Sequence, residues 1–330
     1  MELDDIDKKL LNIIQVEFPL AQEPYSLLGE SLGISTIEVA DRIKKMKAAG
    51  IIRLIGPVLN PYRLGYRTTL VAVKISYANL DEANRLIIQN AMVSHCYQRN
   101  HDFNLWFTLA TPITEDMDAV IRKLANSIKA EKAINLPALR TFKIEALFGV
   151  AGAHPSMLKS KGSRTAFPDD KEISLSNVDR LVINALPEDL PLNERPFDFI
   201  ALNLEMSTDE FLNYCRNLLQ QGIMRRFSAA VNHSRLGFTA NAMTCWQVPQ
   251  DKVDNAGGKI ASFDEVSHCY ERGTNSLWPY NLFAMVHADN RENCLAIIDR
   301  IGIQASLRKN EKTLLFSTEE VKKTRVKYSV

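Results

Sequence analysis

Paired cysteine motifs, long apolar runs and a strong net charge are all missing from this chain of 330 residues. None of the five cysteines belongs to a C-x-x-C pair, which argues against a disulfide framework or a structural zinc site. No apolar run is long enough to span a bilayer, and the acidic start Met1-Glu2-Leu3-Asp4-Asp5 lacks the apolar core of a signal peptide. The formal net charge of +1 does not mark a nucleic-acid binder. These absences predict a protein of the reducing cytoplasm without a membrane segment.

The chain does contain a long internal repeat. Arg63-Leu64-Gly65 recurs as Arg235-Leu236-Gly237, and the offset is 235 − 63 = 172. His95-Cys96-Tyr97 recurs as His268-Cys269-Tyr270, with an offset of 268 − 95 = 173. A period this long indicates duplication of whole domains. Two fused copies predict an intramolecular pseudo-dimer, with further homo-oligomerisation left open.

Each copy opens with a pattern typical of a helix-turn-helix. Asp4 or Asp5 can cap a first helix, and Pro24 stands where a second helix would begin. Ser35 can cap a third helix, which Gly50 would end. The segment 51–64 then resembles a small wing or linker.

The rest of each copy is expected to follow the order βαββαβ of a ferredoxin-like domain. In the first copy we expect strands at 68–73, 93–99, 104–109 and 139–147, and helices at 81–90 and 115–129. In the second copy we expect strands at 242–248, 266–272, 281–287 and 313–316. The predicted fold is therefore α+β, a tandem duplication of a winged-helix-like unit followed by a βαββαβ unit.

Five segments follow from the repeat. They are a first helix-turn-helix unit at 1–64, a first ferredoxin-like domain at 65–150, a linker at 151–171 rich in Gly, Ser, Pro and Lys, a second helix-turn-helix unit at 172–236 and a second ferredoxin-like domain at 237–330. We expect the two ferredoxin-like sheets to pack face to face, with a ligand pocket at or near their pairing surface.

A helix-turn-helix followed by a βαββαβ domain resembles the Lrp/AsnC family of transcription regulators, whose ferredoxin-like unit is the effector domain. The charges of the reading helices weigh against DNA binding. The first helix, at 35–49, carries four basic residues, whereas the second, at 207–221, carries only Arg216 against Asp209 and Glu210. Affinity for DNA comes mainly from cations, so the second copy is a poor reader of a half-site.

Longer motifs resemble the siroheme decarboxylases, which are similar to Lrp/AsnC proteins converted into enzymes. In the first half these motifs are 53–58, 63–66 and 95–109, which are similar to one subunit type of that family. In the second half they are 225–227, 233–238, 268–272 and 277–283, which are similar to the other subunit type. The chain thus resembles a fusion of the two subunits that act in nitrite-reductase haem synthesis or in the siroheme-dependent route to haem.

The resemblance implies a carboxy-lyase that removes the carboxyl groups of two acetate side chains of siroheme, giving didecarboxysiroheme. No electron acceptor is needed, so no redox cofactor or resident metal is implied, and the substrate carries its own iron. A transcription regulator of the Lrp/AsnC type is one alternative. A haem-sensing or haem-binding protein without chemistry is another.

His95 and His101 are the candidate acid/base residues, because a proton must reach the methylene carbon and histidine is the natural donor near neutral pH. His268 is the counterpart of His95, and both could instead share a structural role. His101 lies in a turn whose second-copy equivalent is four residues longer, since 281 − 104 = 177, and has no histidine. A histidine here could also be an axial ligand of the substrate iron, and the spacing of the residues does not distinguish an iron ligand from a proton donor.

The candidate binding residues are cations, further histidines and aromatics. Arginine can hold carboxylates in a bidentate manner, although ordinary salt bridges are the alternative role. Aromatic side chains could wall the macrocycle or belong to the core. These candidates are Arg53, Arg99, Arg225, Arg226, His233, His268, Arg272, Trp278 and Tyr280. His154 and His287 are expected to be structural.

Overall fold

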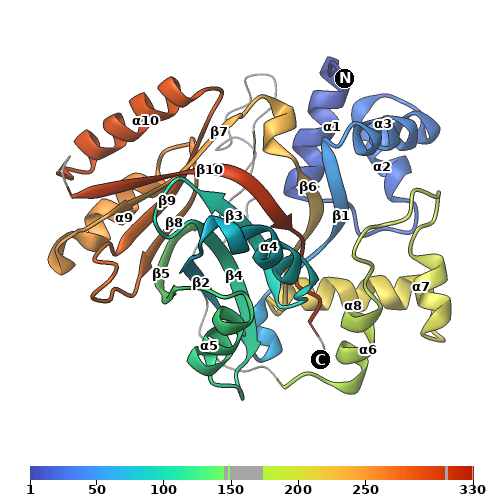
Figure 1. The fold of residues 1–330 in the computed structure, drawn as a ribbon. Helices are drawn as coiled ribbons and strands as arrows, with labels where there is room; N and C mark the ends of the chain where they lie inside the picture. The colour runs from blue at the N-terminus through green and yellow to red at the C-terminus, as the bar shows by residue number, and fades with distance from the viewer. Residues whose placement is uncertain (145–147, 149–173, 309–310, 329) are drawn as a thin grey trace.

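The computed structural model describes residues 1–144, 148, 174–308, 311–328 and 330. The expected linker at 151–171 and His154 lie outside these residues. Two helix-turn-helix units lie beside a β-barrel, and a two-stranded ribbon lies between them (Figure 1). None of the helices in the described ranges is long and apolar enough to cross a membrane.

The first helix-turn-helix unit forms where its capping residues predict. It consists of α1 (Asp5–Val16), α2 (Pro24–Leu32), α3 (Thr36–Ala48) and strand β1 (Ile52–Leu59). Asp4 closes a capping box with Asp7 at the start of α1, and the Ser35 side chain accepts from the amide of Glu38 at the start of α3. Gly50 has a φ of 69°, a left-handed conformation that glycine adopts without a steric cost.

The second unit repeats this arrangement with α6 (Asn177–Ala185), α7 (Asp198–Asn203), α8 (Thr208–Gln220) and β6 (Met224–Val231). Strands β1 and β6 pair antiparallel, with Ile55 opposite Ala229. The segment 51–64 was expected to be a wing or linker, and most of it is β1, which forms half of this ribbon. The two units share one hydrophobic core, in which Phe18 of the first contacts Phe227 of the second.

Both βαββαβ domains are present. The first contains β2 (Tyr66–Lys74), α4 (Leu80–Gln89), β3 (Val93–Arg99), β4 (Leu105–Pro112), α5 (Met117–Ser127) and β5 (Lys132–Ile144). The second contains β7 (Ala240–Trp246), α9 (Val253–Ala261), β8 (Val266–Arg272), β9 (Leu282–Ala288), α10 (Arg291–Gln304) and β10 (Lys312–Lys323). Short 3-10 turns, η1 (Pro61–Leu64) and η4 (His233–Leu236), lead from the ribbon into β2 and β7.

The two sheets join edge to edge into one closed barrel, in the order β10-β3-β4-β2-β5-β8-β9-β7. The expectation of two sheets that only pack face to face is therefore incomplete. Strand β5 pairs first with β2 of its own half and, from Ala138 onward, with β8 of the other half. Strand β10 pairs with β7 and then, from Ser317, with β3. Both strands are longer than expected, because each supplies an edge to the other half and closure removes exposed sheet edges.

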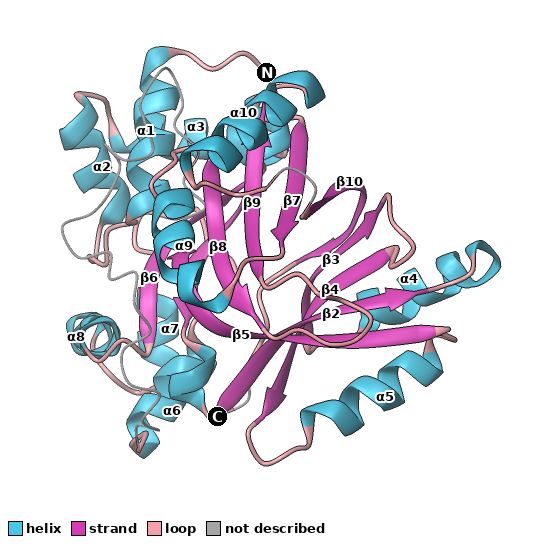
Figure 2. Ribbon diagram, turned by 90° about the vertical axis from the view of Figure 1, so that its left-hand side faces the viewer, coloured by secondary structure: helices cyan, strands magenta, loops and turns pink. Residues whose placement is uncertain are grey.

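The helices of the two domains cover the outside of the barrel, α4 and α5 over the strands of the first half and α9 and α10 over those of the second (Figure 2). Inside the barrel, a core of apolar side chains from both halves includes Trp106, Trp278 and Phe283. This core fills part of the interior. The remainder is a cavity.

Candidate functional site

A cavity of about 470 Å³ lies inside the barrel and against the β1–β6 ribbon. Its walls come from both halves: β2, β3 and β4 of the first, β7, β8 and β9 of the second, both ribbon strands and the chain that follows β10. Trp106, Phe283 and Met243 belong to the apolar core and also line the cavity. The volume is within the usual range for a small-molecule site, and the wall composition allows an apolar ring to be enclosed.

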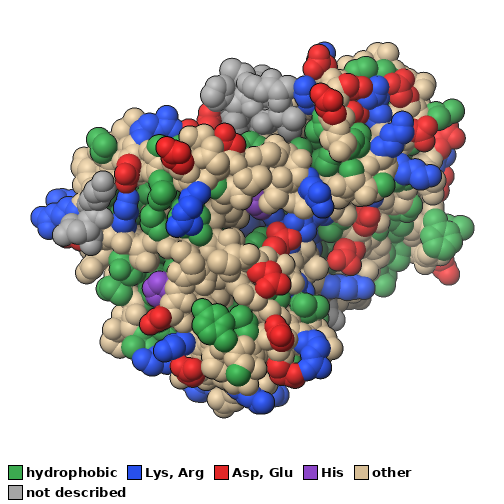
Figure 3. Space-filling model, turned by 45° about the horizontal axis from the view of Figure 1, so that its top comes forward, with side chains coloured by type: hydrophobic (Ala, Val, Ile, Leu, Met, Phe, Trp, Pro, Cys, Tyr) green, Lys and Arg blue, Asp and Glu red, His purple; other side chains and the backbone are tan. Residues whose placement is uncertain are grey.

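The charged side chains of the described residues that line this cavity are all cationic. They are Arg53, Arg99, Arg226, Arg272, Lys323 and Arg325. No Asp or Glu stands among the described residues that line it. Figure 3, which looks onto the top of the molecule as drawn in Figure 1, shows histidine and Lys or Arg side chains in a recess near its centre, with acidic side chains beside them. Such a site favours a ligand with several negative charges.

Two of the arginines are related by the internal repeat and are held in the same way. Arg99, at the end of β3, donates from Nη1 to the carbonyl oxygen of Leu315 on β10 at 2.8 Å. Arg272, at the end of β8, donates from Nη1 to the carbonyl oxygen of Leu136 on β5, also at 2.8 Å. Each guanidinium therefore binds a strand of the other half. Both arginines support the barrel closure as well as lining the cavity.

The other cations enter from the ribbon and from the end of the chain. Arg53 forms an ion pair with Glu320 at 2.7 Å, and Arg325 donates to the carbonyl oxygen of Pro57 at 2.8 Å. Burial lowers the pKa of Lys323 to about 8 and that of Arg325 to about 10. These lower pKa values follow from burial of the two cations close to other cations. A bound polyanion would stabilise their charged forms.

Four histidines reach the cavity, one from the first half and three from the second. They are His95 on β3, His233 on η4, His268 on β8 and His287 on β9. His95 Nδ1 lies 2.8 Å from the hydroxyl of Ser94, and His268 Nδ1 lies 2.9 Å from that of Ser267. The rings of His233 and His287 meet edge to face, with centroids 5.2 Å apart.

These imidazoles are neutral in the unliganded protein. Desolvation, followed by the nearby positive charges, lowers the pKa of His95 to about 4 and those of His233 and His268 to about 3. The pKa of His287 is also well below its usual value, mainly because of burial. A carboxylate that enters the cavity would favour the protonated ring and raise these values. Binding of an anionic ligand can therefore convert a histidine into a proton donor.

The same shifts predict that the unliganded protein loses stability in mild acid. A histidine whose folded pKa is depressed binds fewer protons when folded, so stability is full above its unfolded pKa of about 6.5 and falls as the pH falls toward 4. Between pH 7.5 and 5.5 each of the two most buried rings, His233 and His287, should cost about 1 kcal/mol. Urea unfolding at the two pH values measures this, and equal free energies of unfolding would contradict the neutral assignment.

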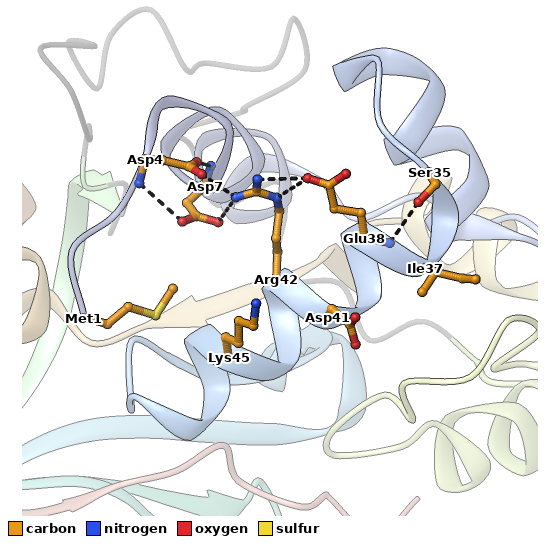
Figure 4. Close-up of a pocket in the computed structure, with 9 residues that line it drawn as sticks. All are labelled: Met1, Asp4, Asp7, Ser35, Ile37, Glu38, Asp41, Arg42 and Lys45. Atoms are coloured by element: carbon orange, nitrogen blue, oxygen red, sulfur yellow. Dashed lines mark hydrogen bonds and ion pairs between the residues drawn. The ribbon is translucent and has the colours of Figure 1, made fainter.

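A second hollow lies on the first helix-turn-helix unit and is lined by side chains of its reading helix, α3, and of the start of the chain (Figure 4). Arg42 of α3 donates to Asp4 at 2.7 Å, to Asp7 at 2.8 Å and to Glu38 at 2.9 Å. Lys47 of the same helix forms an ion pair with Asp189 at 2.6 Å. Two of the four basic side chains on this helix are thus engaged within the protein, which reduces the charge available for a phosphate backbone.

Comparison with known proteins identifies both halves. A family model described as "AsnC-like ligand binding domain" matches residues 63–143 and 235–322. A second, described as "Siroheme decarboxylase NirDL-like HTH domain", matches residues 7–53 and 179–225. A siroheme decarboxylase of Hydrogenobacter thermophilus is 37% identical over 321 residues, which cover 97% of this chain and 94% of that protein. The chain belongs to the siroheme decarboxylase family.

Relatives of this family occur both as single chains and as separate subunits. The crystal structure of the siroheme decarboxylase NirDL in co-complex with an iron-uroporphyrin III analogue aligns with a TM-score of 0.72 and 33% identity, covering 99% of this chain and 95% of that one. The siroheme decarboxylase beta subunit of Methanosarcina barkeri is 38% identical over 153 residues, which cover 46% of this chain and 99% of the subunit. The present member of the siroheme decarboxylase family is a fused form of the two-subunit enzyme.

Seven of the eleven residues proposed from the sequence lie on the central cavity of this siroheme decarboxylase family member. They are Arg53, His95, Arg99, Arg226, His233, His268 and Arg272. Four others, His101, Arg225, Trp278 and Tyr280, are not among its lining residues. The cavity therefore collects residues from both copies of the repeat.

His101 packs in the aromatic core and does not line the cavity. Its Nδ1 accepts from the amide of Phe103 at 3.0 Å, and its ring meets Trp278 edge to face with centroids 5.4 Å apart. Trp278 packs in turn on Trp106, which is the residue that reaches the cavity, and Tyr280 packs on Trp278. The turn that carries His101 lies beyond this aromatic layer, so the structure does not place His101 on the cavity.

Arg225 does not line the cavity because of its place on strand β6. Successive side chains of a strand point to opposite faces, and Arg226 takes the cavity face of β6. Arg225 donates to the side-chain oxygen of Asn60 at 3.1 Å, and burial lowers its pKa. Of these two expected cations, the structure therefore places Arg226 on the cavity and Arg225 elsewhere.

Several cavity residues were missed from the sequence. His287 was expected to be structural, and no role was assigned to Tyr97, Tyr270, Lys323 or Arg325, all of which line the cavity. The two tyrosines could have been found from the sequence, because every second residue of a strand lies on the same face and His95, Tyr97 and Arg99 share one face of β3. Nothing in the local sequence marks His287, since its partners come from other strands.

Proposed function

We propose that this protein decarboxylates siroheme, removing the carboxyl groups of two acetate side chains and leaving methyl groups. The observation that carries this proposal is the cavity itself, which is lined by cations and neutral histidines and by no acid among its described residues. Family membership gives the substrate class, because the relatives are named siroheme decarboxylases. The protein would accordingly be a carboxy-lyase.

The arginines and Lys323 would hold the carboxylates of the substrate. Arginine is suited to this because its planar guanidinium binds carboxylates in a bidentate manner and stays charged when buried. Arg53 and Arg226 reach in from the ribbon, and Arg99 and Arg272 from the barrel wall. Trp106 and Phe283 supply apolar surface for the macrocycle, while the iron arrives with the substrate.

The histidines would supply protons. Cleavage of each bond to a carboxylate carbon releases carbon dioxide and leaves the electron pair on the methylene carbon, which takes up one proton to become a methyl group. The step is redox-neutral, so its balance requires no electron acceptor. His95 and His268 occupy equivalent places in the two halves and are the proposed donors, each of which would take up the proton it donates when a substrate carboxylate raises its pKa.

The decisive experiment is anaerobic incubation of the purified protein with siroheme, followed by mass spectrometry of the tetrapyrrole. Loss of two carbon dioxide masses is expected. Siroheme that is bound but unchanged would overturn the proposal in favour of a carrier or sensor. Salt-sensitive binding to a specific DNA sequence would favour the alternative of a regulator of the Lrp/AsnC type.

We further propose a location in the reducing cytoplasm. The five cysteines are all buried and free, which supports this assignment.

A further inference from the structure

The hydroxyl group of Ser267 joins two histidines of the cavity. It lies 2.9 Å from Nδ1 of His268 on the same strand and 2.7 Å from Nε2 of His287 on the neighbouring strand. Ser267 and His287 are both buried, with exposed fractions of 5% and 8%. A hydroxyl has one proton to donate, so it cannot donate to both rings.

The direction of this hydrogen-bond chain follows from the far side of His287. Its Nδ1 is buried and has no hydrogen-bond partner among the residues that the structure describes. An N–H group there would lose its hydrogen bond to water without replacement, which costs more than leaving a bare lone pair. His287 therefore carries its proton on Nε2 and donates it to Ser267, and Ser267 donates to Nδ1 of His268. The remaining proton of His268 is then on Nε2.

The first half lacks the third member of this chain. Ser94 lies 2.8 Å from Nδ1 of His95, as Ser267 does from His268. The offset between the equivalent strands β4 and β9 is 281 − 104 = 177, so the counterpart of His287 is residue 287 − 177 = 110, which is Ala110. Alanine has no polar group to bond to Ser94. The Ser94 hydroxyl can therefore donate to His95 or accept from it, and Ala110 does not select one tautomer of His95.

We infer that Ser267 and His287 are positioning residues that hold His268 as a proton donor with its Nε2–H facing the substrate. This inference rests on the proposed function and adds that the two donors are not equivalent. When a substrate carboxylate causes His268 to take up a proton from solvent, Ser267 can rotate and accept from both rings, since a hydroxyl oxygen has two lone pairs. His268 then transfers its Nε2 proton to the methylene carbon as carbon dioxide leaves.

Nitrogen-15 NMR of the full chain with labelled histidine tests the direction of the chain without any substrate. The parent protein should show His268 protonated on Nε2 and His287 protonated on Nε2. In Ser267→Ala the His268 signals should shift toward a mixture of tautomers, whereas Ser94→Ala should shift only those of His95. A parent protein with His268 protonated on Nδ1 would overturn the inference, as would a Ser267→Ala variant with unchanged tautomers.

Single-turnover reactions with siroheme test the consequence for catalysis. Ser267→Ala should slow one of the two decarboxylations by about tenfold to a hundredfold, so that a monodecarboxylated product accumulates, because loss of a group that orients an active imidazole has effects of this size. Ser267→Thr, which keeps the hydroxyl, should restore the rate. Equal rates in parent and Ser267→Ala would overturn the inference. A parent protein that releases no carbon dioxide would overturn the proposed function instead, and the NMR result would still decide the direction of the hydrogen bonds.

Discussion

Replacing His268 with alanine is expected to lower the rate of siroheme decarboxylation by about a hundredfold to ten-thousandfold, the usual contribution of a general acid. The ring lies on the cavity wall and is aligned through Ser267. Its removal deletes a proton donor while leaving the six cations that line the cavity. Substrate affinity should therefore change much less than the rate, and single-turnover kinetics with a separate binding titration would show the difference.

His101→Ala is the matched control for this experiment. It removes a histidine that is half-buried and packed on Trp278, outside the cavity. Its effect should appear as a lower thermal stability, with the rate per folded molecule close to that of the parent. If His101→Ala lost as much activity as His268→Ala, the substrate would have to bind beyond the aromatic layer, and the site described above would be wrong.

Replacing Arg226 with glutamine is expected to weaken siroheme binding by about tenfold to a hundredfold. The side chain of Arg226 faces the cavity from β6, where a guanidinium can make charge-assisted hydrogen bonds to a carboxylate. Such bonds contribute about 1.5–3 kcal/mol each, which corresponds to this range of dissociation constants. Absorption titration of the anaerobic protein with siroheme measures the change directly.

Arg225→Gln provides an internal comparison one residue away. It removes the same charge from the same strand, but from the opposite face, where Arg225 bonds to Asn60. The expected result is a small change in affinity together with some loss of stability. Equal weakening by the two substitutions would show that net charge alone controls binding, and would contradict a direct contact with Arg226.

The duplicated organisation could be predicted from the sequence because local signals specify it. Capping residues, glycines and the change of hydrophobic period define helices and strands within each copy, and β3 and β8 have the expected bounds. The barrel could not be predicted in this way, since β5 and β10 obtain half of their hydrogen bonds from the other copy. Pro137 illustrates the limit: a proline interrupts a strand pattern, and here it stands where β5 changes partners.

The site was predictable where the repeat preserves a motif and unpredictable where the two copies meet. His95, Arg99, His268 and Arg272 stand in repeated motifs, and all four line the cavity. His287 could not be recognised, because its significance depends on Ser267 across the sheet. His101 does not line this cavity, because its turn lies beyond Trp278, and the sequence does not say on which side of such an aromatic layer a turn between strands will lie.

The exchange of β5 and β10 also limits what a symmetric version of this protein could do. A homodimer of either half would be isologous, so both of its faces would present the same groups to a ligand. The present chain offers His95 with Ala110 on one side and His268 with His287 on the other. Joining two unlike copies in one closed barrel breaks that symmetry in every molecule, and under the proposed function it would let the site distinguish two similar carboxyl groups of one substrate.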